Sequence, residues 1–202
     1  KCVMPEYEFV GTLRNADLTG EGCFIAFRKD DFVLLSLDTF WLSPTPAVPG
    51  SRFEEQSKYP RICVAAYLYH KESGKFLWVY DAHLDHISES ARVLGMKCLL
   101  ARMKENNARN PAPTFLLGDF NTRPGTDTLH LIESTAEPAL TELTASVPGT
   151  FHNFGKETDN PRKIDYIYAS GEVKAENVCT VETCKDGIFL SDHYPVAANF
   201  TF

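Results

Sequence analysis

The chain of 202 residues is 44% hydrophobic and 23% charged, the composition of an ordinary folded domain, and we expect a single domain over residues 1–202. Its net charge of −7 argues against a protein that grips nucleic acid through a broad basic face. No apolar run reaches the roughly 18 residues of a spanning helix, so no membrane span is predicted.

The first half of the chain is predicted to consist mainly of β-strands, because β-branched and aromatic residues recur in short runs between polar turns. The short turn at residues 29–31 favours antiparallel pairing of the strands on either side. The proline-rich segment 43–51 is predicted to be a surface loop. The predicted strands cover residues 5–11, 21–27, 32–41, 62–69 and 76–83.

The second half of the chain mixes helices and strands. An apolar stripe at helical spacing predicts a helix over residues 88–106, and a shorter helix is expected at 126–133. Many strands with few helices between them indicate an α+β fold with packed sheets. The strands expected in this half cover residues 114–117, 163–169, 173–182 and 194–202.

Asp119 and Asn121 stand at alternate positions after the apolar run 114–117 and its closing glycine. Alternate residues of an extended chain share a face, so a carboxylate and an amide would project together from the end of a buried strand. Such a pair suits a hard metal ion with a phosphate beside it. Asp and Asn also begin turns that carry no chemistry, so the pair alone is only moderately specific.

Three other blocks place carboxylates and histidines near strand ends. Asp165 lies among aromatic and β-branched residues, where a charge is costly unless something needs it. Asp192 and His193 stand side by side before the last predicted strand, and His83 closes the strand 76–83. Together with Asp119 and its neighbours, these blocks predict one polar site built from several strand ends.

With these four blocks in this order, the chain resembles the endonuclease/exonuclease/phosphatase superfamily of metal-dependent phosphoester hydrolases. The resemblance covers nearly the whole chain and implies a four-layer α/β/β/α sandwich of two mostly antiparallel sheets flanked by helices. Members of this family begin with a strand–helix–strand segment that carries a glutamate metal ligand, and this sequence has no counterpart of it. We therefore expect the sequence to be N-terminally incomplete, and as it stands to bind metal weakly.

The resemblance implies roles for five residues. His193 would be the base that activates water, and Asp165 would orient its ring. Asp119, Asn121 and Asp192 would hold a divalent metal, and Asp119 and Asn121 would also contact the phosphate. Because these ligands offer oxygen atoms only, the metal predicted is Mg²⁺ or Mn²⁺.

Further residues would face the phosphate from the opposite side. The resemblance places His83 there, as a general acid or a hydrogen-bond donor. Glu21 stands where deoxyribonuclease-like members carry a carboxylate that supports this histidine. Arg14 is a candidate for binding the substrate phosphate, and so is Arg61, although surface arginines usually have no such role.

The remaining histidines are weaker candidates. Asp85 and His86 complete a His-Leu-Asp-His run that resembles the family, but a role in the site and a role in stabilising their loop have equal weight. His70, His130 and His152 are interpreted as structural.

The predicted function is metal-dependent hydrolysis of a phosphoester substrate, either a small molecule or a nucleic acid, by a monomeric protein. The acidic net charge favours a small or intermediate phosphoester over duplex DNA. The alternatives are a nuclease that acts on DNA or RNA and a non-catalytic member that keeps the fold as a binding module.

The six cysteines lie in apolar surroundings without the spacing of zinc ligands. Free thiols in a reducing compartment are the simplest interpretation, and they favour a cytoplasmic location. A bridge between Cys179 and Cys184 would instead favour export.

Overall fold

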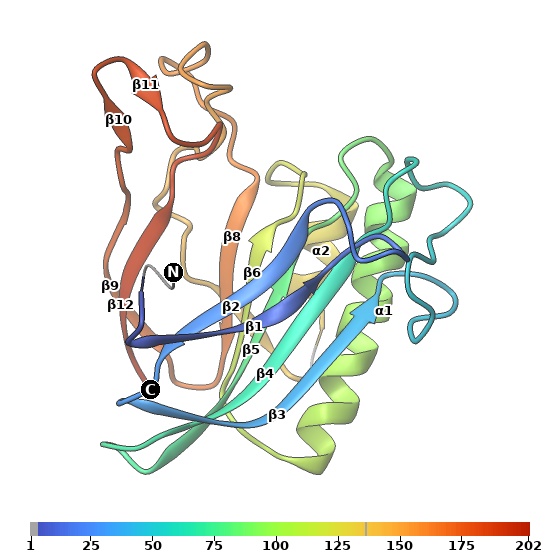
Figure 1. The fold of residues 1–202 in the computed structure, drawn as a ribbon, viewed down its shortest axis with the longest axis vertical. Helices are drawn as coiled ribbons and strands as arrows, with labels where there is room; N and C mark the ends of the chain where they lie inside the picture. The colour runs from blue at the N-terminus through green and yellow to red at the C-terminus, as the bar shows by residue number, and fades with distance from the viewer. Residues whose placement is uncertain (1–3, 136) are drawn as a thin grey trace.

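A six-stranded sheet forms the centre of the computed structural model, which describes residues 4–135 and 137–202 (Figure 1). Neighbouring strands are antiparallel except β5 and β6, which are parallel because α1 connects them across the sheet. In spatial order the strands are β3 (Phe32–Trp41), β4 (Ile62–His70), β5 (Lys75–Ala82), β6 (Thr114–Asp119), β8 (Asp165–Ser170) and β7 (Leu140–Glu142).

Two antiparallel strand pairs pack on one face of this sheet. They are β1 (Tyr7–Leu13) with β2 (Gly22–Arg28), and β9 (Lys174–Thr180) with β12 (Val196–Thr201). Side chains that alternate inward along β2 meet apolar side chains of the central sheet in one core cluster. A small hairpin, β10 (Cys184–Lys185) with β11 (Ile188–Phe189), lies between β9 and β12 in the chain.

Two helices, α1 (Glu89–Arg109) and α2 (Asp127–Glu133), pack on the opposite face of the sheet. The side chain of Ser88 caps α1 by accepting a hydrogen bond from the backbone N–H of Ala91. Layers of helix, sheet and strand pairs thus form the α/β sandwich expected from the sequence, and this fold class is confirmed. Within the described ranges, both helices lie on the same face of the central sheet. Neither of them is long and apolar enough to cross a membrane.

Most predicted elements are present with ends shifted by a few residues, and the short strands β7, β10 and β11 were not predicted. The strand expected from Lys163 begins at Asp165 because the N–H groups of Ile164 and Asp165 donate to the Thr150 hydroxyl. Cys179 and Cys184 carry free thiols, as do the other cysteines that the structure describes. Cys2 lies outside the described residues.

Gly118 sets how closely the ends of β5 and β6 approach each other. Its φ of +135° is unfavourable for other residues, and a Cβ at this position would lie 2.0 Å from the carbonyl oxygen of Ala82. The next residue, Asp119, accepts a backbone hydrogen bond from the N–H of Leu84. A glycine is therefore required where β6 brings Asp119 beside the residues that follow β5.

Candidate active site

The residues predicted from the sequence meet in one cleft of about 640 Å³, at the edge of the sheet where β5 and β6 end and β8 begins. Asp165 lies behind His193, outside the residues that line this cleft. The other seven candidate site residues line the cleft: Arg14, Glu21, His83, Asp119, Asn121, Asp192 and His193. Segments far apart in the sequence therefore converge as expected.

His193 and Asp165 form a hydrogen-bonded pair. The His193 Nδ1 donates to the Asp165 Oδ2 at 2.8 Å, so the second ring nitrogen, Nε2, is left free to act as a base. This Nε2 lies 3.9 Å from the Asp119 Oδ2, and the ring of Phe151 stands edge-on to the imidazole at 5.1 Å. The His193 ring is thus oriented by the Asp165 carboxylate and by the ring of Phe151.

Three side chains are close enough to share a cation. Asp119 and Asp165 are opposite each other in the register of β6 and β8, and one ligand atom from each of Asp119, Asp165 and His193 lies within 4.8 Å of the others. Asp192 lines the same cleft but is not part of this group. Its backbone carbonyl accepts hydrogen bonds from the N–H groups of His152 and Asn153 and so orders the loop.

The two carboxylates and the imidazole perturb one another. Burial raises the pKa of Asp119, and the negative charge of Asp165 raises it further. Burial lowers the pKa of His193, but the hydrogen bond to Asp165 and the charges of Asp165, Asp119 and Asp192 outweigh it, so this pKa lies above its ordinary value. Crowded carboxylates of this kind are what a divalent cation stabilises.

Asn121 lines the cleft in a left-handed conformation, with φ of 51°. Its backbone N–H donates to the Asp119 Oδ1 at 2.8 Å, and its Nδ2 donates to the carbonyl of Leu84 at 3.1 Å. These contacts leave the amide oxygen available as a ligand. Oxygen donors from Asp119 and Asn121 beside Asp165 and His193 suit a hard divalent ion.

His83 lines the same cleft as His193, and both imidazoles approach Asp119. Its Nε2 lies 3.5 Å from the Asp119 Oδ2, and its Nδ1 lies 3.8 Å from the Glu21 Oε2. Burial lowers the His83 pKa to about 3, and the positive charges of Arg61 and Arg14 add to that effect. A neutral imidazole at pH 7 favours the role of hydrogen-bond donor over that of general acid.

Arg14 and Glu21 support this side of the cleft. They form an ion pair, and the Arg14 guanidinium lies over the ring of Tyr59 at 4.4 Å. Arg14 is buried, and its contacts hold it in place beside the cleft. The carboxylate of Glu21 therefore contacts both Arg14 and His83, of which the resemblance implied only His83.

Tyr59, Phe151 and Arg162 also line the cleft, and sequence reasoning missed Tyr59 and Phe151. The Arg162 guanidinium lies over the Phe151 ring at 4.1 Å, and the two residues are joined by an isolated β-bridge. Tyr59 and Phe151 stand in irregular segments without periodicity, so no local pattern marks them. His152, interpreted as structural, is fully buried, and its Nδ1 accepts a hydrogen bond from the N–H of Gly155.

The sequence profile of the endonuclease/exonuclease/phosphatase family matches residues 22–193. An endonuclease/exonuclease/phosphatase from Bacteroides vulgatus superposes with a TM-score of 0.88 at 27% sequence identity, and the match covers 98% of this chain and 77% of that one. A functionally unknown conserved protein from Enterococcus faecalis gives a TM-score of 0.86 at 30% identity, with 96% and 77% covered.

A mannosyl-6-phosphatase from Bacteroides thetaiotaomicron is also similar, with a TM-score of 0.86 at 27% identity over 98% of this chain and 78% of that one. Among curated proteins, no significant match to this sequence was found. The profile match spans most of the chain and confirms the resemblance predicted from the four polar blocks. The chain belongs to the endonuclease/exonuclease/phosphatase family, whose members hydrolyse phosphoester bonds.

Proposed function

We propose that this protein hydrolyses a phosphoester with the help of Mg²⁺ or Mn²⁺, using water activated by the His193–Asp165 pair. The observation that carries the proposal is the convergence of Asp119, Asp165 and His193 within 4.8 Å beside the cleft. A non-catalytic binding module would have no use for two crowded carboxylates whose mutual repulsion raises a pKa.

In the proposed reaction, a water molecule forms a bond to phosphorus while its proton passes to the His193 Nε2. Asp165 holds the imidazole in place and stabilises the imidazolium that forms. The ester oxygen leaves with the electron pair of its bond to phosphorus and takes a proton from solvent. The His193 proton is then lost to solvent, which restores the base.

The metal would be held by Asp119 and Asn121, with Asp192 near it in the cleft. It would neutralise negative charge on the phosphoryl group. His83, as a neutral imidazole supported by Glu21, would donate a hydrogen bond to the phosphoryl group, and Arg14 would add positive charge on the same side.

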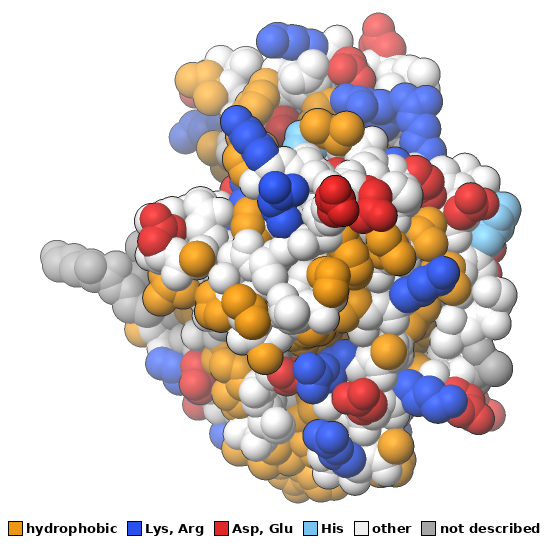
Figure 2. Space-filling view, turned by 90° about the vertical axis from the view of Figure 1, so that its right-hand side faces the viewer, with side chains coloured by type: hydrophobic (Ala, Val, Ile, Leu, Met, Phe, Trp, Pro, Cys, Tyr) orange, Lys and Arg blue, Asp and Glu red, His pale blue; other side chains and the backbone are white. Residues whose placement is uncertain are grey.

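A small or intermediate phosphoester is the proposed substrate. On the face shown in Figure 2, Lys and Arg side chains lie among Asp and Glu side chains and do not merge into one broad basic surface. Together with the net charge of −7, this favours a compact substrate over duplex DNA. The similarity to a phosphatase that acts on a mannosyl phosphate supports the same choice. We expect the protein to act as a monomeric single domain.

Hydrolysis should be tested with the full-length protein on sugar phosphates, inositol phosphates, bis-p-nitrophenyl phosphate, single-stranded DNA and RNA. We expect phosphate release from small substrates that stops with a chelator and returns with Mg²⁺ or Mn²⁺. Cleavage of nucleic acid alone would replace the proposed substrate class by a nuclease. Metal binding without turnover of any of these substrates would support the binding-module alternative.

Replacing Asp165 by asparagine tests the pairing with His193. The Asp165 charge and hydrogen bond raise the His193 pKa above 6.5, so their removal should lower that pKa. The acid limb of the kcat/KM profile, which reports loss of the neutral base, should move to lower pH, while kcat falls about a hundredfold because the ring is no longer oriented. A pH profile with an unmoved acid limb would show that this limb does not report His193.

A further inference from the structure

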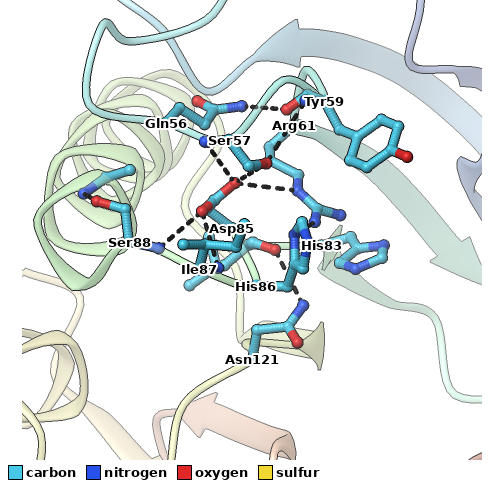
Figure 3. Close-up of polar contacts among 12 residues, drawn as sticks. Gln56, Ser57, Tyr59, Arg61, His83, Asp85, His86, Ile87, Ser88 and Asn121 are labelled. Atoms are coloured by element: carbon cyan, nitrogen blue, oxygen red, sulfur yellow. Dashed lines mark hydrogen bonds and ion pairs between the residues drawn. The ribbon is translucent and has the colours of Figure 1, made fainter.

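A chain of three polar residues, Asp85, Arg61 and His86, runs from the protein interior to the wall of the cleft (Figure 3). It begins at Asp85, whose side chain is only 2% exposed. One carboxylate oxygen accepts the backbone N–H groups of Ile87 and Ser88 at 3.0 and 2.9 Å, and the other accepts the N–H and the hydroxyl of Ser57. Asp85 is therefore fixed as an ionised, fully bonded anchor.

Arg61 links this anchor to the cleft. The guanidinium is 4% exposed, its Nε lies 3.8 Å from the Asp85 Oδ2, and its Nη2 lies 2.8 Å from the His86 Nδ1. Its Nε and Nη1 have no hydrogen-bond partner within the described part of the chain. A buried ion pair with two unpaired donor nitrogens costs stability, which implies a role other than holding the fold together.

The contact with Arg61 determines the protonation pattern of His86. A guanidinium donates hydrogen bonds and cannot accept them, so the His86 Nδ1 must be the acceptor. The ring proton then resides on Nε2. His86 is exposed, lines the cleft and lies beside the Tyr59 ring, with 5.9 Å between centroids. The network thus keeps one N–H donor available on the cleft wall that also carries His83.

We propose that His86 is a substrate-binding residue whose Nε2–H donates to a phosphoryl oxygen, and that Arg61 and Asp85 are positioning residues that maintain this tautomer. The inference rests on the proposed function, because it names the part of the phosphoester substrate, a phosphoryl oxygen, that would contact His86. The charged groups beside His86 favour binding of a negatively charged hydrogen-bond acceptor. Arg14 and Arg61 both carry positive charge there, and Asp85 lies at 3.8 Å from Arg61 without a direct hydrogen bond.

The tautomer can be measured without any activity. Long-range proton–nitrogen correlation spectra of the histidine rings should show a protonated Nε2 and an unprotonated Nδ1 for His86 in the unaltered protein. Arg61→Met should give a mixture of both tautomers, and Arg61→Lys, which keeps a donor, should restore most of the original pattern. A protonated Nδ1 in the unaltered protein would overturn the proposal.

Binding is tested by calorimetric titration with inorganic phosphate in the presence of Mg²⁺. His86→Ala should weaken phosphate binding about tenfold, because one hydrogen bond to a charged group is lost. His86→Gln, which offers an N–H near the same position, should recover part of the affinity. His130→Ala changes an exposed histidine on α2 and should leave the affinity unchanged.

The failures of the two proposals are distinguishable. If His86→Ala binds phosphate as tightly as the unaltered protein and retains its KM for a hydrolysed substrate, the role of His86 is refuted and the hydrolase function stands. If no phosphoester is hydrolysed but phosphate binding still depends on His86, the hydrolase function is refuted and the binding site stands.

Discussion

Replacing His193 by alanine is expected to lower kcat about a thousandfold while the protein stays folded. Within the described residues, His193 is the imidazole whose Nδ1 is held by a carboxylate and whose Nε2 is free beside the cleft. The side chain is 23% exposed, so its removal leaves no closed cavity in the core. Steady-state kinetics with a small phosphoester and a melting curve would measure the two effects separately.

His130→Ala is the matched control for this change, because it removes an exposed imidazole from α2 without touching the cleft. Free imidazole added to the His193→Ala protein should restore part of the rate, since the missing side chain leaves room beside Asp165. If His193→Ala turns over substrate at the original rate with an unchanged melting temperature, His193 is not the base.

The polar residues at strand ends were predictable because two simple rules apply to them. Asp119 ends the buried run of β6, and a carboxylate in the apolar strand β8 marks Asp165. Asn121 lies beyond β6 in a left-handed conformation, so its place beside Asp119 comes from the turn and not from strand alternation. Cross-strand register then puts Asp119 opposite Asp165, a contact that the sequence implied only through family resemblance. The positions of Asp119 and Asp165 at strand ends were therefore accessible to sequence reasoning, whereas their contact was not.

The aromatic side of the cleft was not predictable. Phe151 reaches His193 through an irregular segment that forms isolated bridges instead of a regular ladder, so periodicity carries no signal there. The role of His86 was left open for a different reason. Only the three-dimensional contact with Arg61, which lies 25 positions earlier in the chain, shows which nitrogen of the ring is occupied.

Strand pairing across the layers was also beyond the sequence. The alternating pattern of β2 identifies its buried face but not the partner that covers it. In the structure that partner is the central sheet, while β9 and β12 form a separate pair on the same face. Long-range packing of this kind depends on contacts that no local window contains.

Replacing Asp119 by asparagine should stabilise the metal-free protein while removing most of its response to metal. Burial and the charge of Asp165 raise the pKa of Asp119 in the folded state, so the folded protein loses stability as the pH rises through that pKa. Asparagine carries no charge and avoids this loss. At about pH 8 we expect a gain of about 1 kcal/mol, or about 2–4 °C in melting temperature, and the gain should vanish near pH 4.

Mg²⁺ should reverse the order of the two proteins. An ion that binds only the folded state adds about 2.7 kcal/mol at a hundred times its dissociation constant, so the unaltered protein should gain several degrees. The Asp119→Asn protein lacks a charged ligand oxygen and should gain little, and its kcat should fall with the loss of metal. Thermal melts with and without Mg²⁺, in a buffer treated with chelator, measure both effects. Equal stabilisation of the two proteins by Mg²⁺ would show that the cation binds elsewhere, because the proposed site takes a charged ligand oxygen from Asp119.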